Sequence, residues 1–116
     1  MYFVLFVLHD AEKCDRLLSA WENAGVQGVT VLHSTGLGRM RGSEWMDDLP
    51  LFPSLETLAE HEEYFSRTLF TVVDSESSVD RLVDATEEVV GDLMKPETGF
   101  LVVLPTLRVY GLNKKR

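Results

Sequence analysis

The stretch Tyr2-Phe3-Val4-Leu5-Phe6-Val7-Leu8 is a continuous run of aliphatic and aromatic residues. A run of this kind is typical of a strand that is buried on both faces of a sheet. It is too short to cross a membrane as a helix, and it lacks the basic start and the small-residue cleavage site of a signal peptide. We therefore expect it to form a core strand of a cytoplasmic domain.

A helix and a second strand are predicted to follow this first strand. Asp10 can cap the helix, and Gly25 stands where a glycine commonly ends one. Between them the apolar residues recur at helical spacing: Cys14, Leu17, Leu18, Trp21 and Ala24. Residues 28–33 have the composition of a strand. The strand, the helix and the second strand together form one β-α-β unit.

The second half of the chain repeats this plan. Residues 68–73 and 99–104 are predicted strands, and Pro105 ends the second of them. Turn and capping residues at 74–78 precede a helix with one apolar face, which comprises Val79, Leu82, Val83, Thr86 and Val90. A last short extended piece is expected over 107–112.

Two β-α-β units in tandem predict a ferredoxin-like β-α-β-β-α-β fold of the α+β class. The 116 residues fit a single domain, 1–116, with a four-stranded antiparallel sheet that carries both helices on one face. The other face then needs a cover. In a chain this short the expected cover is another copy of the chain, so we expect a homo-oligomer.

The charge balance and the cysteine count argue against several functions. The formal net charge is −8, and a field of this sign repels nucleic acid and anionic lipid. Cys14 is the only cysteine, so the chain can form no internal disulfide and no cysteine-rich zinc site. We expect Cys14 to be a small buried hydrophobic residue, and we expect neither nucleic-acid binding nor membrane insertion.

The segment that joins the two halves, 34–66, is far too long for a hairpin loop, and loops of this length are commonly functional. It contains a dense apolar patch, which comprises Trp45, Met46, Leu49, Leu51 and Phe52. Either the patch packs against the body of the protein or a neighbouring subunit, or it is an exposed docking site for a partner. The sequence leaves both interpretations open.

Two loops with glycines are candidates for binding an anion. Thr35-Gly36-Leu37-Gly38-Arg39 follows directly on a strand, its glycines let backbone amides approach a phosphate, and Arg39 can make a bidentate contact. The alternative is a plain flexible turn. The second loop, 91–99, ends in Thr98 and Gly99, but it lacks the Gly-Lys-Ser/Thr ending of a P-loop. Its alternative is a loop that only joins a helix to a strand.

No catalytic arrangement is recognisable. The sequence has no Gly-x-Ser-x-Gly elbow and no His-Glu-x-x-His helix, and the three histidines are irregularly spaced. His61-Glu62-Glu63 could hold a metal together with Asp47 and Asp48, but an exposed acidic helix is the simpler interpretation. We therefore expect no enzyme, no metal site and no cofactor.

Taken together, these stretches resemble the PII nitrogen-regulatory family. Its members are trimeric proteins that sense adenine nucleotides and regulate transporters and enzymes through a long loop. The resemblance covers most of the chain outside the central loop and the region around Met94. The matching stretches are 21–31, Gly36-Leu37-Gly38-Arg39, which is similar to the Gly-Phe-Gly-Arg that opens the family's T-loop, Leu104-Pro105 and Arg108-Val109-Tyr110.

The resemblance implies a homotrimer with a nucleotide cleft between subunits. Thr30 and the backbone of Gly36, Leu37 and Gly38 would lie beside the nucleotide, and Val72 would line its adenine side. Arg39 would face phosphates, and Thr98 and Gly99 would belong to the phosphate-cradling B-loop. The whole implied set is Thr30, Gly36, Leu37, Gly38, Arg39, Val72, Thr98, Gly99 and Arg108. An adenine nucleotide is thus the candidate effector. A regulated protein, such as the cytoplasmic face of a membrane transporter, is the candidate partner.

The chain departs from the family at several polar positions. The family's glutamine after Gly-Phe-Gly-Arg helps hold magnesium and 2-oxoglutarate; here it is Met40, so 2-oxoglutarate sensing is expected to be lost. The B-loop lysine is Phe100, and two later phosphate-binding arginines are Gly111 and Asn113. The loss of three cations weakens the attraction for a triphosphate. No tyrosine matches the uridylylation site, so the chain looks closer to a divergent PII-like branch.

Three hypotheses about function remain. The first is a PII-like trimeric regulator that binds a small anionic effector between subunits and engages a partner through its central loop; Gly36-Leu37-Gly38-Arg39 favours it. The second is a trimeric ferredoxin-like metal-binding protein of the ion-tolerance type, which the scattered histidines and the lone cysteine disfavour. The third is a ferredoxin-like enzyme with unrecognised acid–base residues, which no sequence feature favours.

Overall fold

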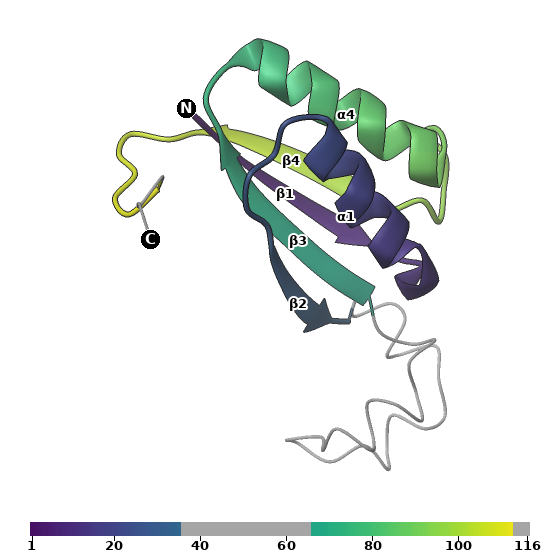
Figure 1. Cartoon of the computed structure of the whole chain (residues 1–116). Coiled ribbons are helices and arrows are strands. Elements are labelled where there is room, and N and C mark those ends of the chain that lie inside the picture. The colour runs from purple at the N-terminus through teal and green to yellow at the C-terminus, as the bar shows by residue number, and fades with distance from the viewer. Residues whose placement is uncertain (36–65, 113–116) are drawn as a thin grey trace, which may run out of the picture.

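The computed structural model describes residues 1–35 and 66–112 of the chain. These residues form a sheet covered on one face by a layer of two helices (Figure 1). In chain order the elements are β1 (Tyr2–Leu8), the 3-10 helix η1 (Ala11–Lys13), α1 (Cys14–Asn23), β2 (Thr30–Ser34), β3 (Ser66–Val73), α4 (Glu76–Val90) and β4 (Phe100–Pro105). This is the β-α-β-β-α-β order that the sequence predicts.

The four strands lie in the order β2-β3-β1-β4, and each strand is antiparallel to its neighbours. β1 is therefore a central strand, as its apolar composition predicts, while β2 and β4 form the two edges. Both helices lie on the same face of the sheet (Figure 1). The predicted ferredoxin-like fold is confirmed.

Side chains along β1 point alternately to the two faces of the sheet, and these faces differ in burial. Val4, Phe6 and Leu8 point toward the helices and are at most 1% exposed. Phe3 and Leu5 point the other way and are only half-buried. The prediction that β1 is buried on both faces is therefore wrong for the single chain, because no element of the described residues covers the second face.

The two helices are joined in the core by a hydrogen bond between side chains. The indole Nε1–H of Trp21 donates to Oγ1 of Thr86 over 2.8 Å, and this hydroxyl donates in turn to the carbonyl oxygen of Leu82 over 2.7 Å. All three residues are fully buried. Because a buried polar group without a partner is costly, this bond fixes how α1 and α4 pack.

Capping residues set the ends of the helices as expected. Asp10 caps the 3-10 helix η1, which leads directly into α1, by accepting a hydrogen bond from the amide of Glu12; α1 itself has no side-chain cap at its start. Gly25 adopts a φ of +100° just after α1. Ser75 caps α4 by accepting from the amide of Ser78. Cys14 begins α1 and is half-buried rather than fully buried, and this burial raises the pKa of its thiol.

The chain beyond β4 is not a strand, so the extended piece expected over 107–112 is wrong. The amide of Thr106 still donates to the carbonyl of Met1, but the last strand pair between β1 and β4 is that of Tyr2 with Pro105. The chain therefore leaves the sheet, and Leu107 and Tyr110 are exposed. No helix among the described residues is long and apolar enough to cross a membrane.

Candidate functional site

Two of the predicted site residues lie on the face of the sheet that the helices leave uncovered. Thr30 pairs with Phe70, and Val72 pairs with Phe3, so all four side chains share that face. The rings of Phe3 and Phe70 lie 5.6 Å apart between centroids. Thr30 is one strand away from Val72, displaced by two residues, and the two therefore lie close together.

The edge strand β4 extends this face with three apolar side chains. Phe100 is 54% exposed and Leu104 is 51% exposed, with Val102 between them. They share the face with Phe3 because Leu104 pairs with Phe3. Large apolar side chains exposed in a row on a strand are a typical sign of an interface.

Several of the described site residues lie at opposite ends of the sheet. At one end Ser34 pairs with Ser66, and Thr98 lies there too because it is two residues before Phe100, the first residue of β4. At the other end Tyr2 pairs with Val73 and Pro105, so Val72 and Arg108 belong there. A single chain does not bring these groups together.

The loop before β4 has a folded structure of its own. The amide of Met94 donates to Oδ1 of Asp92 over 2.9 Å, and the hydroxyl of Thr98 donates to the carbonyl of Lys95 over 3.0 Å. Glu97 adopts a φ of +68°, which is uncommon for a residue with a side chain. The proton of the Thr98 hydroxyl is thus already used, although its oxygen can still accept a hydrogen bond from a ligand.

Gly99 has a structural reason to be glycine that the sequence did not reveal. Its φ is +112°, and a Cβ at this position would collide with the carbonyl oxygen of Val7 and lie 2.9 Å from Cζ of Phe6. The backbone of residue 99 therefore passes directly against β1. This packing explains the glycine whether or not a phosphate binds beside it.

Hydrogen bonds from two hydroxyl groups of β3 join it to Ser34, the last residue of β2, at the point where the central segment leaves the sheet. The Thr68 hydroxyl donates to Oγ of Ser34 over 2.8 Å, and the Ser66 hydroxyl donates to the Ser34 carbonyl over 3.5 Å. Gly36, Leu37, Gly38 and Arg39 follow at once in the chain and lie outside the described residues. So does the apolar patch around Trp45.

Arg108 lies in the irregular segment after β4. Its guanidinium is exposed, and Nη1 donates to the hydroxyl of Tyr110 at the long distance of 3.5 Å. It does not line the depression described next.

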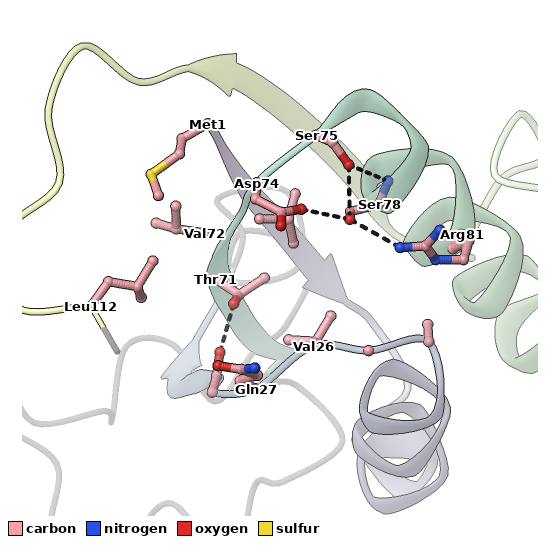
Figure 2. A pocket seen from close by; sticks show the side chains of 14 residues that line it. Met1, Val26, Gln27, Thr71, Val72, Asp74, Ser75, Ser78, Arg81 and Leu112 are labelled. Carbon is pink, nitrogen blue, oxygen red and sulfur yellow. Dashed lines mark hydrogen bonds between the residues drawn. The ribbon is translucent and has the colours of Figure 1, made fainter. Parts of the chain in front are cut away.

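A depression of about 350 Å³ opens at the edge of the sheet beside the start of α4 (Figure 2). It exists because β3 continues to Val73, whereas its last pair with β2 is at Phe70. Beyond that pair, the Thr71 hydroxyl donates a hydrogen bond to the carbonyl oxygen of Gly28 over 2.6 Å. The lining comprises residues 24–28 and 71–75 with Met1, Ser78, Arg81 and Leu112. Val72 is the one predicted site residue among these described lining residues.

One side of the depression carries a network of hydrogen bonds centred on Ser78. The Ser78 hydroxyl donates to Oδ1 of Asp74 over 2.9 Å, and it accepts from Nη2 of Arg81 over 3.1 Å. The Ser75 hydroxyl also donates to the Ser78 oxygen, over 3.0 Å. The hydrogen bond from Ser78 is the main reason that the pKa of Asp74 is lowered, so this carboxylate stays ionised.

The sequence predicts residues 74–78 only as turn and capping residues. The available signal was spacing: Asp74, Ser78 and Arg81 are separated by four and three residues, which places them on one side of the first turns of α4. Nowhere among the described residues are three or more His, Cys, Asp or Glu side chains grouped as metal ligands. The metal candidates at His61-Glu62-Glu63, Asp47 and Asp48 lie outside the described residues.

Comparison with known proteins gives a match over almost the whole of this structure. A family model described as Nitrogen regulatory protein P-II matches residues 4–114. No curated protein matches the chain. The matched range contains both helices, three complete strands and most of β1.

Proposed function

From the premise that the chain belongs to the P-II nitrogen regulatory protein family, we propose that it is a trimeric regulator that binds a small anionic effector between subunits. The proposal includes a partner protein, engaged through the segment 34–66, and a cytoplasmic location. The proteins of this family are regulators rather than enzymes. The cytoplasmic face of a membrane transporter is the first partner to test.

The observation that supports this proposal best is the separation of the candidate residues. Thr98 and Gly99 lie at one end of the sheet, and Val72 and Arg108 lie at the other. A site made from both groups therefore requires at least two copies of the chain. The uncovered apolar face, with Phe100 half exposed, offers the surface over which such copies would pack.

The chemistry of the described residues favours an effector of low charge. Phe100, the first residue of β4, stands where the family has its phosphate-binding B-loop lysine. Gly111 stands where the family has a phosphate-binding arginine, and it has no side chain. Arg39 and Arg108 are the cations that remain in the proposed site. We therefore infer that an adenine nucleotide with one or two phosphates, or a cyclic one, is bound in preference to a triphosphate.

A thermal-shift screen identifies the effector. The ligands are ATP, ADP, AMP, cyclic AMP, bicarbonate and divalent metal ions, since a ligand that binds the native state raises the melting temperature. A shift with AMP or cyclic AMP that exceeds the shift with ATP supports the proposal. A shift with divalent metals alone favours the ion-tolerance alternative and contradicts it.

Arg39→Ala then tests the site itself by calorimetry with the ligand that the screen identifies. Loss of one charge-assisted contact should weaken binding by about 10- to 150-fold. Arg16→Ala, at an exposed position on α1, is the matched control and should leave the affinity unchanged. Unchanged affinity in a folded Arg39→Ala trimer would place the effector elsewhere.

A further inference from the structure

The loop that joins α4 to β4 (Figure 1) contains a cation that the proposed effector site does not include. Lys95 is exposed, and its ammonium forms no ion pair or hydrogen bond with another residue that the structure describes. By contrast, Arg81 donates to Ser78, and Arg108 donates to Tyr110. The charge of Lys95 therefore has no evident use within the described fold.

Two hydrogen bonds hold the backbone of Lys95 beside Thr98. The Thr98 hydroxyl donates to the Lys95 carbonyl over 3.0 Å, and the Lys95 amide donates to the carbonyl of Asp92 over 3.0 Å. Residues 96 and 97 form a turn, which brings the Cα atoms on its two sides to within about 7 Å of each other. The base of the lysine side chain is thus fixed, and its flexible four-carbon stem lets the ammonium reach a ligand at Thr98.

The same turn presents backbone donors that have no partner. The amides of Glu97, Thr98 and Gly99 form no hydrogen bond with the residues that the structure describes. Glu97 and Gly99 both have positive φ, at +68° and +112°. Successive N–H groups in turns of this kind form a concavity that suits an anion. Thr98 and Gly99 already belong to the proposed site, so an anionic group bound there is within reach of the Lys95 ammonium.

The loop also contains a negative charge close to these donors. Glu97 is exposed, and its carboxylate forms no hydrogen bond or ion pair inside the described part of the chain. It is two residues from Lys95 and one residue from Thr98. One phosphate group gains from the ammonium, but each additional phosphate brings more negative charge toward the Glu97 carboxylate. The two side chains therefore act in opposite directions on an anionic ligand.

We propose that Lys95 binds one phosphate of the effector and that Glu97 repels a second. The inference rests on the proposed function and deepens it, because it names the number of phosphates and two residues that set this number. Lys95 becomes a third cation of the site, beside Arg39 and Arg108. An adenine nucleotide with a single phosphate is then the expected effector.

Inorganic phosphate and pyrophosphate test the loop without a nucleotide. Each is titrated into the full chain, and the amide NMR shifts of Glu97, Thr98 and Gly99 report binding. Lys95→Gln should weaken phosphate about tenfold, because one charge-assisted contact is lost. Glu97→Asn removes the carboxylate while asparagine still tolerates a positive φ. It should strengthen pyrophosphate about two- to fivefold more than it strengthens phosphate.

Two variants outside the loop are the matched controls. Arg16→Gln removes a positive charge from the exposed side of α1, and Asp84→Asn removes a negative charge from the exposed side of α4. Both change the net charge as the test variants do, so any difference from them measures the local effect of the loop. Thermal melting of each variant checks that it is folded.

Adenosine and AMP connect the loop to the proposed effector site. AMP should bind wild type more tightly than adenosine does, since only AMP has a phosphate. Lys95→Gln should weaken AMP about tenfold and leave the affinity for adenosine unchanged, which calorimetry measures. A loss of affinity for both ligands would point to damage of the whole cleft and would contradict a phosphate contact.

Three further results in the folded protein overturn the inference. These are amides of 97–99 that do not shift with phosphate at roughly ten times a millimolar Kd, a Lys95→Gln effect no larger than that of Arg16→Gln, or a Glu97→Asn effect equal for phosphate and pyrophosphate. Failure of the proposed function gives a different result: phosphate shifts these amides as expected, but neither adenosine nor AMP binds. In that case the adenine effector is wrong and the roles of Lys95 and Glu97 stand.

Discussion

Gly99 and Gly91 provide a test of backbone crowding at the level of single residues. Both have positive φ, at +112° and +91°, but only Gly99 has atoms close to the position of a Cβ. Gly91→Ala should therefore cost about 1–3 kcal/mol from backbone strain alone. Gly99→Ala should cost about 1–3 kcal/mol more, because the methyl group must also displace Phe6 or β1. Urea unfolding of both variants measures the two costs.

Equal losses in the two variants would mean that the loop before β4 moves aside to make room for the methyl group. In that case the close approach of residue 99 to Val7 would not be a fixed feature of the fold. Far-ultraviolet circular dichroism of each folded variant serves as the control for secondary structure.

The packing of single residues was partly predictable from the sequence. Leu82, Thr86 and Val90 fall on the predicted apolar face of α4, and all three are buried. The bond between Trp21 and Thr86 was not predictable, because it joins residues that are far apart in sequence and depends on how two helices meet. Periodicity shows which side of a helix is buried but not what it contacts.

At the scale of the helix, the Ser78 hydroxyl is hydrogen-bonded to three side chains at the start of α4, those of Asp74, Ser75 and Arg81. We predict that Ser78→Ala raises the pKa of Asp74 toward its ordinary value of 3.8, because the main hydrogen bond that favours the carboxylate is lost. Titration of the Asp74 carboxyl group by NMR measures the change. Ser77→Ala is the control, since Ser77 has a hydrogen bond to Ser75 but none to Asp74.

The sign of the pH dependence follows from the direction of this shift. The pKa of Asp74 is lower in the folded protein than in the unfolded chain, so its contribution to stability is present above the ordinary value and is lost as the pH falls through the folded value. Asp74→Asn should make stability depend less on pH below 3.8. An unchanged Asp74 titration in Ser78→Ala would show that other groups hold the carboxylate.

The helices and strands were predictable from the sequence, except where the bounds of a strand depend on the neighbour with which it pairs. The strand expected over 28–33 starts only at Thr30, because the Gly28 carbonyl is taken by the Thr71 hydroxyl instead of a backbone partner. That shortening leaves the edge of β3 free and creates the depression. The extended piece expected at 107–112 is not a strand, and the pairing of β4 with β1 ends at Pro105, which pairs with Tyr2. The amino-acid composition of a segment cannot show where the adjacent strand of the sheet ends.

For the whole molecule, we predict a homotrimer. Light scattering should give about 39 kDa, three times the chain mass of 13.1 kDa, because the uncovered face is apolar across β1, β3 and β4. Leu104→Glu places a charge on that face and should yield smaller species with unchanged circular dichroism. Ser19→Glu adds the same charge to the exposed side of α1 and should leave the trimer intact. A stable wild-type monomer would remove the basis of the inter-subunit site.

The last pair of β2 and β3 has a consequence for how such a protein can change over time. Ser34 and Ser66 face each other, so the chain leaves the sheet and returns to it at the same place. The entropy of closing a flexible loop grows only with the logarithm of its length, about 0.6 kcal/mol for each doubling. Because the two ends are held together by the sheet, a change in the number of residues between them is expected to cost little loop-closure entropy. Insertions and deletions at this place can therefore accumulate during evolution without any change in the core.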